Sequence, residues 1–180
     1  TQASIWVSCG SSRVLVTLCV APKQEGFRDF LPLTVHYQER AYAVGAVPGS
    51  YFRREGRPTE SEILASRLID RSMRPLADPL FFDDMQLIAQ VLSYDSEGVD
   101  CNILAMIGAS AALAVSGLPF EGPFGVAHVG YDGDQFFLMS DREAEVQEAS
   151  QVNLVAAGIK GKKHMIESVA QDYSTHKKSL

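Results

Sequence analysis

Four segments in the first half of the chain are rich in apolar and β-branched residues, and each predicts a β-strand. Two of them, 4–9 and 13–20, flank Gly10-Ser11-Ser12 and should form a hairpin. The third, 30–37, alternates apolar positions with others and places His36 on the opposite face, where we interpret it as structural. The fourth, 85–93, is apolar almost throughout.

Apolar residues recur at helical spacing between these last two strands and again after the fourth. Thr59 and Glu62 have the spacing of a capping box at the start of the first helix, and Pro75 marks its end. The second helix should begin at Asp100 or Asn102 and run to about residue 116. Small residues on nearly every face of it predict a buried central helix.

The remaining residues predict smaller elements. These are strands at 124–131 and 135–139 around the turn residues Asp132-Gly133, a helix at 141–149, strands at 152–157 and 163–166, and a helix at 167–173. We therefore expect residues 1–140 to be the main part of one domain and 141–180 to supply its C-terminal strands and helix. Strands and helices alternate without a strict βαβ repeat, which predicts a two-layer α/β or α+β domain.

The overall composition is that of one ordinary globular domain of 180 residues with a net charge of −6. This charge argues against nucleic-acid binding over the whole surface, so a nucleic-acid site would have to be local. The three cysteines, Cys9, Cys19 and Cys101, have no metal-type spacing, and we expect free thiols in a reducing, cytoplasmic environment. No apolar run reaches membrane-spanning length, so no membrane partner is expected. Because the sequence begins inside a predicted strand, we expect it to be a piece of a longer protein.

One segment combines the chemistry that single-stranded nucleic acid requires. Tyr51 and Phe52 offer flat faces for stacking, and Arg53, Arg54 and Arg57 offer guanidinium groups for phosphates. Glycine and proline on both sides favour a loop, here a long one over 38–58. The alternative is an aromatic pair packed in the core beside surface arginines.

The predicted helix that follows carries three further arginines. Arg67, Arg71 and Arg74 fall at i, i+4 and i+7 and should share one face, with Asp70 placed to pair with Arg74. A local basic patch in an acidic chain indicates a phosphate-bearing partner. These arginines are candidates for contact with RNA or with a neighbouring domain.

Several ordered motifs resemble the first core domain of the polynucleotide phosphorylases. The similarity covers the residues 33–40, 51–60, 66–76, 105–113 and 116–123, including Tyr51-Phe52-Arg53-Arg54-Glu55-Gly56-Arg57-Pro58, and becomes weak after about residue 138. The resemblance implies the RNase PH fold, which is related to the second domain of ribosomal protein S5. It also implies two such domains in each chain and a ring of three chains.

The activity that the resemblance implies is phosphorolysis of single-stranded RNA from its 3′ end, a step in mRNA turnover. Inorganic phosphate is the co-substrate: it attacks the terminal phosphodiester and releases a nucleoside diphosphate. Mg²⁺ is expected in the second core domain and not in this chain. Other implied partners are that second domain, the two further chains of a homotrimer, and proteins of a degradosome-type assembly. A mitochondrial or plastid location is the alternative to the cytoplasm.

The resemblance places no catalytic residue and no metal ligand in this chain. The catalytic domains of the family have a Gly-Ser-Ser-Ser phosphate loop where this sequence has Val99-Asp100-Cys101-Asn102, and an aspartate there would repel phosphate. Tyr51, Phe52, Arg53 and Arg54, with Arg57, correspond to the aromatic–arginine loop that constricts the RNA channel of the ring, where Phe is commoner than Tyr51.

Two other functions remain open at this stage. One is a non-enzymatic RNA-binding subunit of an exosome-type ring, since a catalytic second domain is not within this sequence. The other, weaker one is an enzyme acting on a small phosphorylated metabolite, which would require a closed pocket around residues 53–74.

Overall fold

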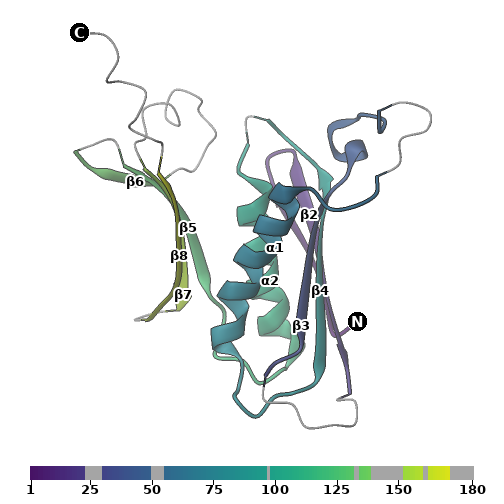
Figure 1. Ribbon diagram of the computed structural model, residues 1–180, viewed down its shortest axis with the longest axis vertical. Coiled ribbons are helices and arrows are strands. Elements are labelled where there is room, and N and C mark those ends of the chain that lie inside the picture. Colours follow the sequence, from purple (N-terminus) through teal and green to yellow (C-terminus); the bar gives the residue numbers. More distant parts are fainter. Residues whose placement is uncertain are drawn as a thin grey trace.

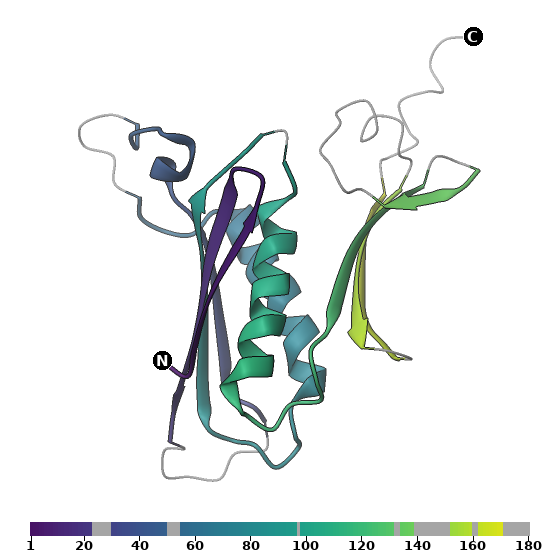
Figure 2. The ribbon, with the colours of Figure 1, turned by 180° about the vertical axis from the view of Figure 1, so that it is seen from behind.

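A computed structural model describes residues 1–22, 30–49, 55–96, 98–131, 134–138, 152–159 and 162–170. These residues form two four-stranded sheets with two α-helices between them (Figure 1). The view from behind shows the same arrangement, with the second sheet on the far side of the helices from the first (Figure 2). This is the mixed α+β architecture that the element order predicts.

The first sheet has the strand order β1-β2-β4-β3. Its strands are β1 (Ala3–Cys9), β2 (Ser12–Ala21), β3 (Leu33–Glu39) and β4 (Asp84–Ser93). β1, β2 and β4 pair antiparallel, whereas β3 runs parallel to β4 and lies at the edge of the sheet. The predicted hairpin is confirmed, with Gly10 in its turn at a φ of 57° that favours glycine.

Helix α1 (Glu60–Met73) begins at the predicted capping box. The Thr59 hydroxyl accepts a hydrogen bond from the Glu62 N–H, and the Glu62 carboxylate accepts one from the Thr59 N–H. A short 3₁₀ helix, η2 (Arg74–Leu76), follows and contains Pro75 in its first turn, where the missing N–H costs no hydrogen bond. The buried side of α1 packs on the sheet through Ile69 and Met73.

Helix α2 (Cys101–Ser116) begins at Asp100, whose carboxylate accepts the Asn102 N–H, and ends at Gly117 in the left-handed conformation. Most of the helix is buried, as predicted for a central helix, although Ile107 and Val115 are exposed.

The core lies between the first sheet and the helices. Every second residue of β2 and β4 points into it and is buried, namely Val14, Val16, Leu18, Met85, Leu87, Ala89 and Val91. The cysteines Cys9, Cys19 and Cys101 are free thiols, as predicted. Within the described residues, neither helix is long and apolar enough to cross a membrane.

The second sheet is antiparallel throughout and has the order β6-β5-β7-β8. Its strands are β5 (Gly125–Tyr131), β6 (Phe136–Leu138), β7 (Val152–Ile159) and β8 (Lys162–Ala170). The predicted strands are thus confirmed, although the turn residues 132 and 133 and the predicted helix at 141–149 lie outside the described residues. The helix predicted for 167–173 is wrong at 167–170, because these residues extend β8 and pair with β7.

The connection between β3 and α1 begins later than the loop predicted over 38–58 and contains regular structure in its first part. β3 continues to Glu39, and a 3₁₀ helix, η1 (Ala41–Val44), follows at once. Gly45 ends η1 in the left-handed conformation, and the Tyr94 N–H donates to the Ala43 carbonyl at 3.0 Å. The connection is therefore fixed to the end of β4 at its beginning.

Candidate functional site

The sequence-predicted RNA-binding residues fall into two groups. Tyr51, Phe52, Arg53 and Arg54 lie outside the described residues. Arg57 is described: it is exposed and lines a small cavity of about 150 Å³ between the end of β3 and the start of α1. Arg57 has no hydrogen bond or ion pair with another described residue.

Glu55 joins the two ends of the β3–α1 connection through contacts with Arg40 and Ala41. One of its carboxylate oxygens accepts the Ala41 N–H at 2.6 Å, and the other lies 3.3 Å from Nη1 of Arg40. Nη2 of Arg40 donates to Oε1 of Gln38 at 3.2 Å. The residue that follows the aromatic–arginine segment is thereby joined to the residues just after β3.

Glu62 makes a second connection beside the first. Its Oε1 accepts the Glu39 N–H at 2.8 Å, while its Oε2 accepts the N–H and the hydroxyl of Thr59 at 2.7 and 2.9 Å. Burial alone would raise the pKa of the Glu62 carboxyl. The hydrogen bonds from Thr59 and Glu39, together with the nearby charge of Arg40, outweigh this effect and lower that pKa.

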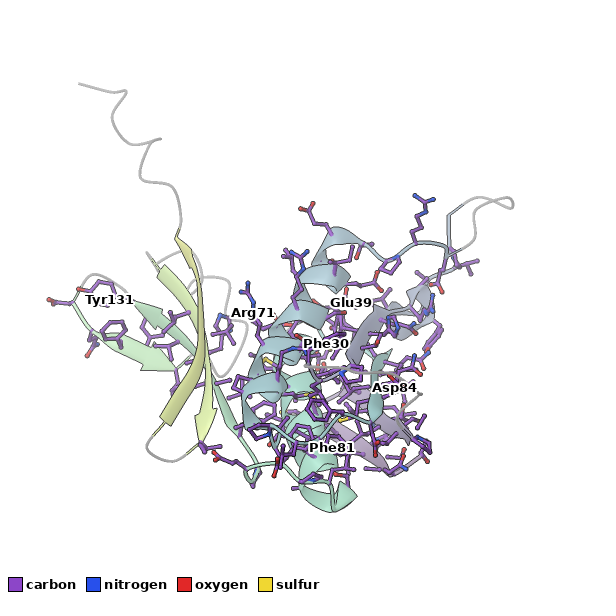
Figure 3. The ribbon with its side chains drawn as sticks, turned by 60° about the horizontal axis from the view of Figure 1, so that its bottom comes forward. Phe30, Glu39, Arg71, Phe81, Asp84 and Tyr131 are labelled. Atoms are coloured by element: carbon purple, nitrogen blue, oxygen red, sulfur yellow. The ribbon has the colours of Figure 1, made fainter. Side chains whose placement is uncertain are left out.

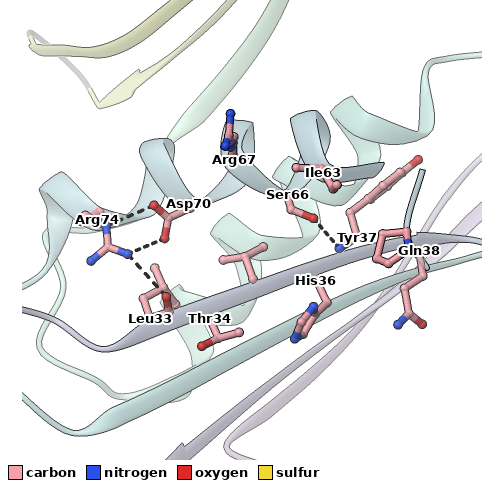
Figure 4. Close-up of a pocket in the computed structure, with 12 residues that line it drawn as sticks. Leu33, Thr34, His36, Tyr37, Gln38, Ile63, Ser66, Arg67, Asp70 and Arg74 are labelled. Atoms are coloured by element: carbon pink, nitrogen blue, oxygen red, sulfur yellow. Dashed lines mark hydrogen bonds and ion pairs between the residues drawn. The ribbon is translucent and has the colours of Figure 1, made fainter. Parts of the chain in front are cut away.

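A groove of about 430 Å³ runs along the edge of β3 beneath α1, and we call it the β3–α1 groove (Figure 4). Side chains of α1 satisfy backbone groups along this edge. The Ser66 hydroxyl accepts the Tyr37 N–H at 2.9 Å, and the Glu62 carboxylate accepts that of Glu39. An edge strand covered in this way does not offer a continuous row of free backbone groups for pairing.

The three helix arginines are brought to different surroundings. Arg67 and Arg74 both line the β3–α1 groove, while Arg71 does not. Figure 3 shows Arg71 on the side of α1 that faces the second sheet. Arg74 is bound to Asp70 and to backbone carbonyls, whereas Arg67 is exposed and has no hydrogen bond or ion pair with another described residue. Arg67 is thus the helix arginine best placed to bind a phosphate.

The cavity beside Arg57 and the β3–α1 groove adjoin each other, since Pro58 and Gln38 line both. Arg57 and Arg67 consequently flank one continuous stretch of surface where β3 and α1 meet. His36 also lines the groove and is exposed. The closed pocket that a small metabolite would require around residues 53–74 involves residues 53 and 54, which lie outside the described residues.

A carboxylate caps the start of α2, where a phosphate would otherwise bind. Oδ1 of Asp100 lies 3.0 Å from the Asn102 N–H that would otherwise face an incoming anion. Burial raises the pKa of the neighbouring Cys101 thiol to about 11, and the charge of Asp100 adds to this rise although a hydrogen bond with Ser12 opposes it. A protonated thiol and an aspartate do not make a phosphate site or a nucleophile.

The described residues also include no group of three or more His, Cys, Asp or Glu side chains that could hold a metal ion.

Sequence reasoning missed the two connections made by glutamates. Glu62 was recognised only as a capping residue, because its bond to Glu39 joins residues 23 positions apart. Glu55 carried no signal of its own: its bonds to Arg40 and Ala41 depend on the path of the intervening chain.

Two solved structures resemble the whole arrangement. One is rice (Oryza sativa) Rrp46, with a TM-score of 0.70 and 12% identity over 96% of this chain and 76% of that chain. The other is the Archaeoglobus fulgidus exosome with RNA bound to the active site, with a TM-score of 0.64 and 16% identity over 94% of this chain and 72% of that chain. At these identities the likeness establishes a shared fold.

The sequence itself matches the RNase PH family, described as 3′ exoribonuclease family, domain 1, over residues 1–119. This stretch contains the first sheet, both helices, the β3–α1 groove and the glutamate connections. The chain therefore belongs to the RNase PH family of 3′ exoribonucleases.

Proposed function

We propose that this chain is the first, non-catalytic core domain of a polynucleotide phosphorylase, and that it guides single-stranded RNA toward a catalytic domain of the same protein. The whole protein would degrade RNA from the 3′ end by phosphate attack and release nucleoside diphosphates. Family membership over residues 1–119 supports the reaction class. The order of the aromatic–arginine motif and the arginines of α1 supports the particular enzyme.

The observation that carries the proposal is a pair of exposed arginines on one surface, neither of which has a partner among the described residues. Arg57 and Arg67 are exposed, have no partner among the described residues, and flank the surface where β3 meets α1. The side chains just upstream of Arg57, from Tyr51 to Arg54, would add stacking faces and further cations. This combination suits the backbone and bases of a single strand.

The start of α2 supports the non-catalytic part of the proposal. A phosphorolytic site must bind inorganic phosphate, and backbone N–H groups at a helix start are a common way to do so. In this chain the Asp100 carboxylate already accepts the Asn102 N–H at 3.0 Å, and its negative charge would repel a phosphate. Phosphate and Mg²⁺ would accordingly bind in the second core domain, in a ring of three chains.

A second candidate is a non-enzymatic subunit of an exosome-type ring. The structural likeness to an archaeal exosome with RNA bound to its active site is the observation that keeps this candidate open. The two candidates differ in what lies beyond this chain: a catalytic RNase PH domain in the same reading frame supports the enzyme, and separate catalytic subunits support the ring subunit. Both require RNA to pass the surface formed by β3 and α1.

The proposal is tested by removing the stacking faces. Tyr51→Ala with Phe52→Ala should weaken the binding of a long single-stranded RNA much more than that of a dinucleotide, which reaches only a catalytic pocket. Stacking contributes on the order of 1–3 kcal/mol per base. Phe136→Ala serves as the control, because Phe136 is an exposed aromatic on the second sheet. Equal losses on long and short RNA would overturn the channel role.

A further inference from the structure

We propose that Glu55 is a positioning residue for RNA binding: its contacts hold the backbone that carries Arg57. This inference rests on the proposed function. Glu55 is acidic and lies within a basic stretch, so simple attraction between charges cannot explain a favourable effect of this residue on RNA. Its contacts suggest an indirect one.

The first step is the contact of Glu55 with both residues that follow β3. Its carboxylate accepts the Ala41 N–H at 2.6 Å and lies 3.3 Å from the guanidinium of Arg40. These residues are 14 and 15 positions away along the chain, so the contacts close a loop of that length. Closing a loop by specific bonds removes conformations that the loop would otherwise have to lose when it binds a ligand.

Arg40 is itself held in place by a second nitrogen of its guanidinium, which does not contact Glu55. Its Nη2 donates to Gln38 at 3.2 Å, and its charge lies close enough to Glu62 to lower the pKa of that carboxyl. Gln38 belongs to β3, which pairs with β4 over its whole length. Glu55 is thus bound to a guanidinium that is anchored on the sheet.

A second anchor lies four residues later in the chain. Thr59 is bound through its N–H and its hydroxyl to Glu62, whose other oxygen accepts the N–H of Glu39. Arg57 stands between Glu55 and Thr59, so its backbone is held on both sides although its own side chain is exposed. This arrangement presents an exposed cation, which has no partner among the described residues, from a backbone that is held on both sides. Such preorganisation lowers the cost of ordering the site when it binds a phosphate.

The sign of the effect of a mutation separates positioning from simple electrostatics. Glu55→Gln removes a negative charge beside cationic groups and releases Arg40 from its ion pair. If charge alone mattered, RNA would bind more tightly. If Glu55 positions the cations, RNA binds more weakly despite the gain in positive charge.

The experiment measures the dissociation constant of the protein for a single-stranded oligoadenylate at one salt concentration. We expect Glu55→Ala to raise the constant by roughly threefold to tenfold, the effect of leaving one or two side chains to be ordered on binding. Glu55→Gln should lose less RNA affinity, because its amide oxygen can still accept the Ala41 N–H. The Ala41 amide should likewise exchange its hydrogen faster in Glu55→Ala than in Glu55→Gln, and most slowly in the unmodified protein.

Glu60→Gln is the matched control. Glu60 is exposed in the first turn of α1, and removal of its charge should leave RNA affinity equal or slightly higher. The thermal midpoint should stay within a few degrees for all variants, since the side chains of Arg40 and Glu55 are 29% and 30% exposed and such pairs add little stability. Affinity that is unchanged or higher in Glu55→Ala overturns the inference but not the proposed function. Absence of RNA binding by the unmodified protein overturns both.

Discussion

The guanidinium of Arg74 donates two hydrogen bonds to the carboxylate of Asp70, one helical turn earlier in the chain. Nη2 lies 2.7 Å from Oδ1 and Nε lies 3.1 Å from Oδ2. The same guanidinium donates to the carbonyl of Leu31 at 2.7 Å and to that of Leu33 at 3.4 Å. Arg74 therefore joins the end of α1 to the edge of the first sheet, which is a structural task.

Arg74→Ala should lower the free energy of unfolding by about 1–2 kcal/mol. The variant loses charge-assisted hydrogen bonds to Asp70 and Leu31, but the partial exposure of the pair reduces their value. Arg67→Ala is the matched control on the same helix, and should change the free energy by less than about 0.5 kcal/mol because its side chain is exposed and has no partner among the described residues. Urea unfolding monitored by circular dichroism measures both. Equal effects of the two substitutions would contradict a structural role for Arg74.

Glu62 should make stability depend on pH. The pKa of its carboxyl is lower in the folded chain than its usual value of 4.5, so its contribution is fully present above that value. The contribution is lost as the pH falls through the lower, folded pKa. Glu62→Gln should therefore cost about 1–2 kcal/mol at pH 7, and the difference from the unmodified chain should shrink below about pH 4.

Urea unfolding of the two proteins at pH 7, 5 and 3 measures this difference. Glu60→Gln, at an exposed position of the same helical turn, should show little difference at any of these pH values. A difference for Glu62→Gln that stays constant down to pH 3 would mean that the charge of its carboxylate is not what stabilises the fold.

Gly108 permits α2 to lie close to the first sheet. A Cβ at this position would stand 2.6 Å from Cγ2 of Val16 and 2.9 Å from Cγ2 of Val7, both shorter than van der Waals contact. Gly108→Ala should destabilise the chain by about 1–2 kcal/mol, since overpacking outweighs the higher helix propensity of alanine. In a Val16→Ala background the same substitution should cost less, because the nearest methyl group is gone. A double-mutant cycle by urea unfolding measures this coupling, and additivity of the two substitutions would rule out the clash.

The features that the sequence predicts well are those decided by neighbours in the chain. Thr59 and Glu62 form the capping box of α1, and Asp100 caps α2, because each bond spans two or three residues. The strands of the first sheet follow from their apolar pattern. The strand at 167–170 could not be predicted in this way, because a register with β7 decides it.

The candidate site, too, combines features set by neighbours in the chain with features set by long-range contacts. The residue types of the aromatic–arginine segment can be read directly, and Arg57 and Arg67 can be nominated as phosphate ligands. What distinguishes Arg67 from Arg74 is a set of bonds from Arg74 to carbonyls 41 and 43 residues away. Such long-range contacts have no local signature, so the sequence predicts the pairing of Arg74 with Asp70 but not its bonds to the edge of the first sheet.

This distinction predicts a difference in how salt affects RNA binding. Each lost phosphate contact reduces the slope of log affinity against log salt by about 0.7 for a single strand. Arg67→Ala and Arg57→Ala should each reduce the slope by about this amount, because both guanidiniums are exposed and have no described partner. Arg74→Ala should leave the slope nearly unchanged, because the guanidinium of Arg74 is already hydrogen-bonded to Asp70 and to the carbonyl of Leu31. Fluorescence anisotropy with a labelled oligoadenylate at four salt concentrations gives the slopes. A slope that falls for Arg74→Ala but not for Arg67→Ala would show that RNA displaces the Asp70 contact, and the assignment of Arg67 as the phosphate ligand of α1 would then be wrong.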